Sequence, residues 1–160
     1  MITSLVLSGQ KTITLAPETG QRLRTFCHKF ITDDDYFRAA EISFKEGIKH
    51  IKCYFMIGLP GETDADLEEI VSFVRKMCDT GDVKLYLSIN QFIPKPATDF
   101  ACSPLVPVDE MEDKIKFLKN KFKKIKSVTC RFESLKWSSI QALLASGDRK
   151  MSRIIFLVSK

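Results

Sequence analysis

Closely spaced cysteines are absent from this sequence. It contains five cysteines, an odd number, and each lies more than twenty positions from the next: Cys27, Cys53, Cys78, Cys102 and Cys130. This spacing gives no disulfide framework and no ligand pattern for zinc or an iron–sulfur cluster. We therefore expect buried thiols in a reducing compartment.

Long apolar runs are also absent. Residues 1–9 contain no basic segment and too short an apolar stretch for a signal peptide, and no later segment approaches the length of a membrane span. These absences predict a cytoplasmic protein that does not bind a membrane.

The sequence does have enough apolar residues for one ordinary core. Its 160 residues are 44% hydrophobic and 28% charged, which argues against disorder. The 25 basic residues exceed the 20 acidic ones by five. This mild excess permits an anionic partner without requiring one.

Strand patterns alternate with amphipathic helix patterns along the chain. The predicted strands are residues 11–16, 50–57, 83–92 and 127–132, and the predicted helices are residues 32–47, 63–81, one beginning at Asp109, and 134–145. A proline-rich loop follows the third strand, and a last apolar run covers residues 154–158. Such alternation predicts βαβ units with right-handed crossovers and a parallel sheet.

The first predicted strand lies close to the start of the sequence. Residues 2–8, which precede it, read as the tail of a helix. A sheet that begins in this way predicts that N-terminal units of the fold are missing.

Three segments, in the same order, resemble one known family. They are Ser8–Gly20, which contains Leu-Ala-Pro-Glu-Thr-Gly; Tyr54–Glu62, which reads Tyr-Phe-Met-Ile-Gly-Leu-Pro-Gly-Glu; and Ser88–Thr98. The family is that of radical S-adenosylmethionine (SAM) proteins related to the methylthiotransferases and the coproporphyrinogen-oxidase-like enzymes. Residues 137–149 resemble a trailing segment of an uncharacterised branch that often carries a cobalamin-binding-type domain upstream.

The resemblance implies a set of SAM-binding residues. In the first segment it places a carboxylate and a glycine beside the ribose and amino-acid moiety of SAM, which implies such roles for Glu18, Gly20 and Arg22.

The second segment resembles the family's strand end that packs on the adenine of SAM. The resemblance implies cofactor-binding roles there for Ile57, Gly58 and Glu62. Gln91, at the end of the third strand, is a further candidate, because an amide there can point towards a ligand.

These assignments agree with the position of the residues along the chain. All three segments lie where a strand ends and a loop begins, and βα barrels build their sites at this rim. A glycine allows close approach of the backbone, and a carboxylate accepts hydrogen bonds from ribose hydroxyls or pairs with an ammonium group.

The sequence departs from the family pattern in two ways. The family's cluster motif of three cysteines, separated by three and then two residues, is absent, so this sequence supplies no ligands for the 4Fe-4S cluster of the family. In addition, Gly20-Gln21-Arg22 is shorter than the corresponding family segment. We expect weak or absent SAM binding by this chain alone, and catalytic incompleteness.

The predicted fold class is therefore α/β, a partial (β/α) TIM-like barrel of parallel strands with a C-terminal extension. Residues 1–107 are assigned to the C-terminal half of the radical SAM barrel, and residues 108–160 to its last helix and the extension. The implied function is that of a fragment of a radical SAM iron–sulfur enzyme. Its expected partner is the missing N-terminal half, or a second copy that covers the exposed edge of the sheet.

A non-enzymatic basic α/β module that binds RNA or a protein partner remains as the alternative. It depends on seven lysines between Lys114 and Lys126, interleaved with an apolar stripe. A solvated helix face explains the same pattern.

Overall fold

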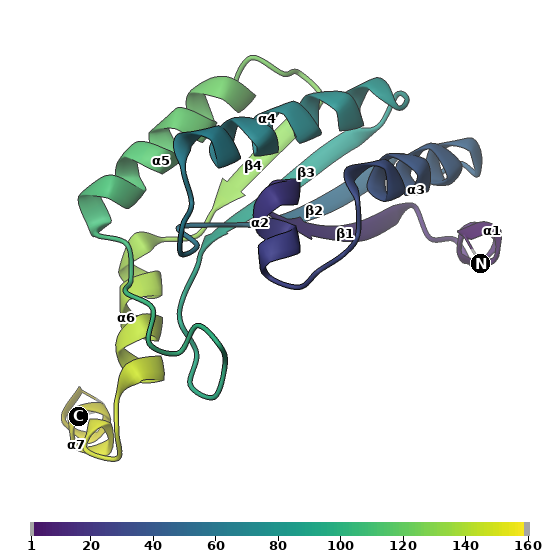
Figure 1. Cartoon of the computed structure of the whole chain (residues 1–160). Helices are drawn as coiled ribbons and strands as arrows, with labels where there is room; N and C mark the ends of the chain where they lie inside the picture. Colours follow the sequence, from purple (N-terminus) through teal and green to yellow (C-terminus); the bar gives the residue numbers. More distant parts are fainter. Residues whose placement is uncertain (1, 159–160) are drawn as a thin grey trace.

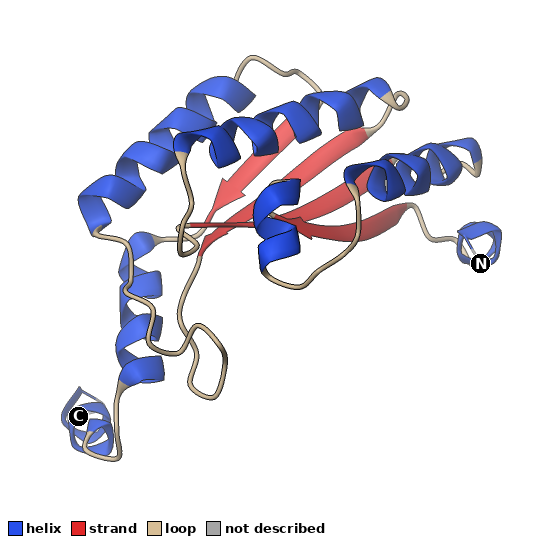
Figure 2. Ribbon diagram, in the orientation of Figure 1, coloured by secondary structure: helices blue, strands red, loops and turns tan. Residues whose placement is uncertain are grey.

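The computed structural model describes residues 2–158, which form a parallel β-sheet with helices packed on one face (Figures 1 and 2). In chain order the elements are α1 (Ile2–Leu7), β1 (Thr12–Glu18), α2 (Gln21–Phe26), α3 (Asp33–Lys45), β2 (His50–Ile57), α4 (Asp64–Asp79), β3 (Lys84–Gln91), α5 (Val108–Phe122), β4 (Val128–Phe132), α6 (Leu135–Ser146) and α7 (Met151–Val158). The four strands lie in the order β1-β2-β3-β4, and all three pairings are parallel. The predicted α/β fold class is confirmed, because this arrangement is that of a partial β/α barrel.

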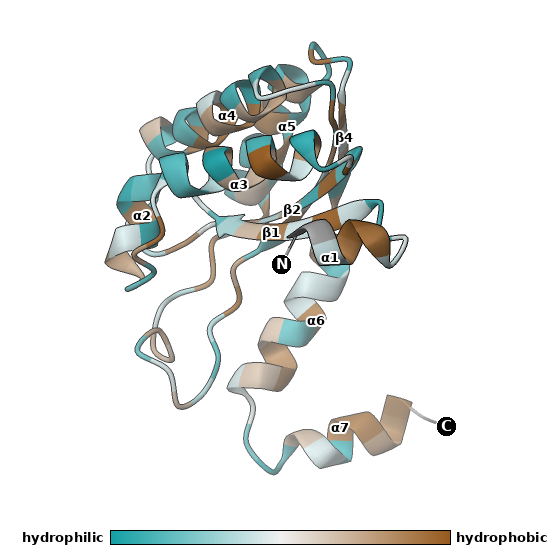
Figure 3. Ribbon diagram, turned by 90° about the vertical axis from the view of Figure 1, so that its right-hand side faces the viewer, coloured by the Kyte–Doolittle hydropathy of each residue, from teal (hydrophilic) through white to brown (hydrophobic). Residues whose placement is uncertain are grey.

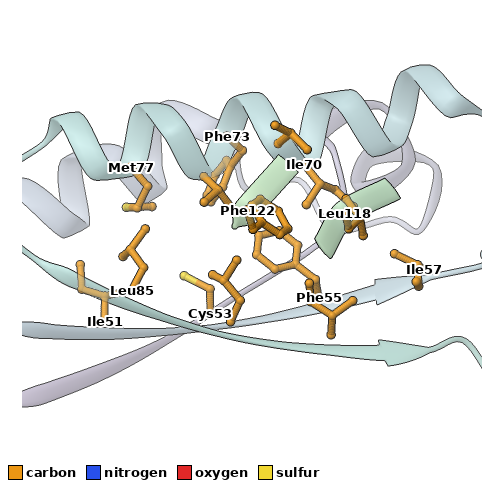
Figure 4. Close-up of a cluster of buried hydrophobic side chains, with 14 of the residues drawn as sticks. Ile51, Cys53, Phe55, Ile57, Ile70, Phe73, Met77, Leu85, Leu118 and Phe122 are labelled. Carbon is orange, nitrogen blue, oxygen red and sulfur yellow. The ribbon is translucent and has the colours of Figure 1, made fainter. Parts of the chain in front are cut away.

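Alternation along β2 and β3 divides the sheet into two different faces. Along β2, every second residue from Ile51 to Ile57 is at most 1% exposed, whereas His50, Lys52, Tyr54 and Met56 are only partly buried. The buried side chains of both strands pack beneath α4 and α5, as Figure 4 shows for Phe55, Phe73 and Phe122. The apolar run at 50–57 predicted a strand buried in a parallel sheet, but helices cover only one of its faces (Figure 1).

Local sequence signals account for the positions of the main helices. Thr32 and Thr63 each begin a capping box, with Asp35 and Asp66 at the reciprocal position, so α3 and α4 begin where expected. The short helix α2 was not predicted, because its six residues carry no periodic apolar pattern. The final apolar run forms α7, which with α6 extends away from the sheet (Figure 1).

Both α6 and α7 leave apolar side chains exposed, and most of α7 has the colour of hydrophobic residues in Figure 3. They include Trp137, Leu143, Leu144 and the residues from Ile154 to Val158. Even so, no helix within residues 2–158 combines the length and hydrophobicity needed to cross a lipid bilayer.

The outer edge of β1 has no partner strand among the described residues, because β1 pairs only with β2. Leu5 and Leu7 of α1, which precedes this strand, are 42% and 84% exposed. An apolar edge on β1 itself, covered by a missing half or a second copy, stays a prediction. The division into residues 1–107 and 108–160 stays a prediction.

Two aromatic residues on opposite faces of the sheet test this layering. Replacing Phe55 with Ala should lower the free energy of unfolding by about 3–5 kcal/mol, since Phe55 is 1% exposed beneath α4. Tyr86, 41% exposed on the other face, is the matched control, and Tyr86→Ala should cost less than about 1 kcal/mol. Urea unfolding of both variants measures the difference, and equal losses would show that both faces of the sheet are buried.

Candidate functional site

The three predicted segments meet at one edge of the sheet. Because all four strands are parallel, their carboxyl ends point in the same direction (Figure 2). Glu18 ends β1, Ile57 ends β2 and Gln91 ends β3. We call this edge the strand-end rim, and it is the position at which α/β folds bind ligands.

Glu18 lies in an unusual backbone conformation at this rim. The pairing of β1 with β2 shifts register between Leu15 and Glu18, and Glu18 has a φ of 67°. A positive φ is uncommon for a residue other than glycine, and such strain clusters at ligand sites. The Glu18 carboxylate accepts a hydrogen bond from the Lys29 ammonium at 2.8 Å.

A buried arginine fixes the backbone on both sides of Glu18. Arg24 is 1% exposed; its Nε donates to the Pro17 carbonyl and its Nη2 to the Thr19 carbonyl, each at 2.9 Å. Its Nη1 pairs with Asp33 at 2.9 Å, which compensates the buried charge.

Two further donors, Lys29 and the Tyr36 hydroxyl, reach the carbonyl of Ala16, at 2.6 and 2.8 Å. The Arg24 guanidinium also lies 5.0 Å from the centre of the Tyr36 ring. Sequence reasoning missed this set of contacts, because they join residues up to twenty positions apart.

Arg22 turns away from Glu18 and towards the start of α4. Its Nε and Nη2 donate to the two carboxylate oxygens of Asp66 at 2.7 and 2.6 Å, and Nη2 also reaches the Gly61 carbonyl at 2.8 Å. Gly20 caps α2 and lies against Glu69, whose Cβ would be 2.8 Å from a Cβ added at position 20. Gly20 and Arg22 therefore join α2 to α4.

Glu62 closes the turn that follows β2. Its side chain is 1% exposed; Oε1 accepts from the Gly58 backbone N–H at 2.9 Å and lies 3.2 Å from the Lys114 ammonium of α5. Burial raises the pKa of the Glu62 carboxyl, against the opposing effect of these two partners. Oε2 has no hydrogen-bond partner among the described residues.

Gly58 has a φ of 82°, which favours glycine, and a Cβ there would lie 2.5 Å from Cε of Met111. The packing of this chain thus already requires glycine at this position.

The side chains of Ile57 and Gln91 lie on the helix-covered face. Ile57 is 1% exposed in the core (Figure 4), and Gln91 donates to the Val106 carbonyl at 3.4 Å. Their neighbours Met56 and Asn90, paired in the β2–β3 register, occupy the open face instead. Met56, Asn90 and Phe100 line a hollow of about 370 Å³ at the rim.

The described residues do not fit a four-iron cluster. No group of three or more cysteine, histidine or acidic side chains in residues 2–158 is placed to hold a metal ion. Burial raises the pKa of Cys53 to about 12 and that of Cys130 to about 11, so both thiols stay protonated at neutral pH.

The lysine-rich helix is α5 with the turn after it, and acids neutralise part of its charge. Lys114 pairs with Glu62 and Glu110, Lys116 with Asp113, and Lys121 with Glu68. The remaining lysines include Lys119, which lies over the Phe132 ring. The structure favours a solvated helix face, and RNA binding stays a prediction.

The parallel sheet, its helix layer and its strand-end rim define an incomplete β/α barrel. Residues 1–74 match the family model described as the radical SAM superfamily. This match covers less than half of the 160 residues, and it supports the resemblance to radical SAM proteins carried by the first two of the three segments.

A longer archaeal protein is similar over most of the chain. It is an uncharacterised protein of Methanocaldococcus jannaschii, 36% identical over 150 residues, which cover 91% of this chain. The match spans 32% of the relative, about a third of its length.

The Arg22–Asp66 pair predicts a specific acid sensitivity. Hydrogen bonds from Arg22 and Thr63 lower the pKa of Asp66 to about 2, below its ordinary value of 3.8. The stabilisation is therefore complete above about pH 4 and is lost as the pH falls towards 2, a change of about 2 kcal/mol.

Urea unfolding at pH 5 and pH 2 measures this contribution. The stability difference between the parent protein and Asp66→Asn should shrink by about 2 kcal/mol at the lower pH. Asp64→Asn, in the same helical turn, is the control and should show no such convergence. A pH-independent difference for Asp66→Asn would contradict the assignment.

The Glu62 contacts predict that its hydrogen bond to the Gly58 N–H contributes more to the free energy of unfolding than its negative charge does. Glu62→Ala should lower the free energy of unfolding by about 1–3 kcal/mol, because the Gly58 N–H loses its acceptor. Glu62→Gln should cost less, since an amide oxygen still accepts that bond. Glu110→Ala removes the exposed partner of Lys114 and should cost under about 1 kcal/mol in the same urea titration. Equal costs for the Ala and Gln variants of Glu62 would contradict this.

Proposed function

We propose that this chain forms the C-terminal wall of a radical SAM barrel and contributes to the SAM site at its strand-end rim. The observation that carries the proposal is the geometry of Glu18. Its backbone has a strained, positive φ, and Arg24, Lys29 and Tyr36 hold the neighbouring carbonyls at the end of β1. The chain would otherwise avoid this conformation, which costs of the order of 1–3 kcal/mol.

Glu18 would accept hydrogen bonds from the ribose hydroxyls or pair with the ammonium group of SAM. In this structure Lys29 pairs with Glu18, at 2.8 Å, and both side chains are partly exposed. A bound ammonium group would compete with Lys29 for the same carboxylate.

The turn from Gly58 to Gly61 would offer backbone atoms to the adenine. In this proposal Arg22 and Glu62 act indirectly, because their side chains hold that turn through Gly61 and Gly58. Gly20, Ile57 and Gln91 likewise serve the packing beneath the rim, and Met56 and Asn90 face the ligand.

The cluster would come from outside this chain. SAM supplies radical chemistry when bound at a reduced iron–sulfur cluster, and the residues of this chain would bind and orient it. The remaining barrel strands would pair with the free edge of β1, which has no partner strand among the described residues. A second copy on the same edge is the alternative occupant.

Binding of SAM to the purified chain tests the proposal. Isothermal titration with millimolar SAM should give weak, saturable binding, and Glu18→Gln should weaken it about tenfold, as expected for one charged hydrogen bond. Glu41→Gln, an exposed acid of α3, is the matched control and should leave the affinity unchanged.

Two outcomes would contradict the proposal. One is equal SAM affinity of the Glu18→Gln variant and the parent protein. The other is the absence of SAM binding together with salt-dependent binding of an RNA oligomer, which would support the alternative basic module.

A further inference from the structure

A second hollow lies on the open face of the sheet, away from the helix layer. Its volume is about 790 Å³, within the range of small-molecule sites, and strands β2, β3 and β4 form its floor. The first turn of α6 borders it through Ser134 and Trp137. In a closed barrel this face would line the interior.

The strand register places the side chains of the floor in two adjacent rows. Lys52, Tyr86 and Thr129 are register partners across the three strands and form one row. The next row towards the rim contains Tyr54, Ser88 and Arg131. Lys52 on β2 and Arg131 on β4 lie on either side of β3, two strand spacings of about 4.8 Å apart, and their long side chains border the same hollow.

The charge of this hollow is positive and uncompensated. Lys52 and Arg131 line it with only one acid, Glu133, and neither cation lies within 4.0 Å of a carboxylate among residues 2–158. The Lys52 ammonium instead lies 4.6 Å from the centre of the Tyr54 ring. Two unpaired cations in a concave surface attract an anion.

The remaining lining residues suit a flat ligand with polar edges. Tyr86 and Trp137 are 41% and 61% exposed, so their rings are accessible to a ligand in the hollow. Ser88 and Asn90 add a hydroxyl and an amide group to the lining. Aromatic faces stack on planar groups, and hydroxyls and amides bind their polar edges.

We propose that this hollow binds a planar, anionic small molecule, with Lys52 and Arg131 holding its phosphate or carboxylate and Tyr86 and Trp137 contacting its ring. The inference rests on the proposed function, since it assigns the substrate class of the barrel to which this wall belongs. Asn90 borders both hollows, but Lys52, Arg131, Tyr86 and Trp137 line only this one, so substitutions at these four residues test it separately from the Glu18 site.

Trp137 gives a direct signal, because it is the single tryptophan of the chain. The probe is uridine 5′-monophosphate, and the readout is the quenching of tryptophan fluorescence. Uridine, which lacks the charge, and inorganic phosphate, which lacks the planar ring, are the two control ligands. The nucleotide should quench Trp137 saturably and bind at least tenfold more tightly than either half.

Substitutions assign the binding to the two rows. Lys52→Gln and Arg131→Gln should each weaken nucleotide binding at least fivefold. Lys84→Gln is the matched control, since Lys84 is an exposed lysine of β3 outside the hollow and should have no effect. Absence of saturable quenching, equal binding of uridine, or an equal effect of Lys84→Gln would overturn the proposal.

The SAM titration separates the two proposals. Arg131→Gln should leave SAM binding unchanged, and Glu18→Gln should leave nucleotide binding unchanged. If the parent protein binds SAM but not the nucleotide, the substrate class alone is refuted, whereas nucleotide binding without SAM binding would refute the SAM site alone.

Discussion

The burial of alternate side chains along β2 and β3 is the constraint on which the rest of the structure depends. Ile51, Cys53, Phe55 and Ile57 pack beneath α4 and α5, and this packing fixes which side chains can face the other way. A shift of register by one residue would bury Lys52 and expose Phe55, at a cost of several kcal/mol. The same contacts that stabilise the helix layer therefore determine the polar composition of the open face.

At the strand-end rim, by contrast, the surrounding contacts stabilise an unfavourable backbone conformation. Here the chain keeps Glu18 at a positive φ and surrounds it with buried donors that satisfy the neighbouring carbonyls. Arg24 combines an ion pair, three carbonyl contacts and two ring contacts, and its removal would leave several buried groups unpaired. Local strain of this kind persists only where the surrounding structure holds it, and it is more common at ligand sites than in plain scaffolding.

Much of the fold was predictable from local patterns. The strand at 50–57 was predicted with the observed boundaries, and the helices predicted from residues 32 and 63 begin within one residue of those positions. The short helix α2 was missed because its six residues carry no periodic apolar pattern. The segments that resemble radical SAM proteins correctly located the rim, since parallel strands bring their ends to one edge.

Individual side-chain directions were less accessible to sequence reasoning. The positions of Arg22 and Glu62 depend on partners 44 and 52 residues away, Asp66 and Lys114, which no local pattern reveals. Likewise, Lys52 and Arg131 border the same hollow only through the register of three strands. Gln91 was the candidate for a ligand contact, but its side chain lies on the helix-covered face, and the side chain of its neighbour Asn90 lies on the open face.

Mapping SAM onto the backbone amides by nuclear magnetic resonance tests the central claim most directly. The account predicts that SAM shifts the amide signals of residues 16–20, 57–61 and 90–92, the carboxyl ends of β1, β2 and β3, and leaves those of α5 unchanged. Shifts confined to the lysine-rich helix, or no shifts at saturating SAM, would contradict the claim that this chain is a SAM-binding wall of a radical SAM barrel.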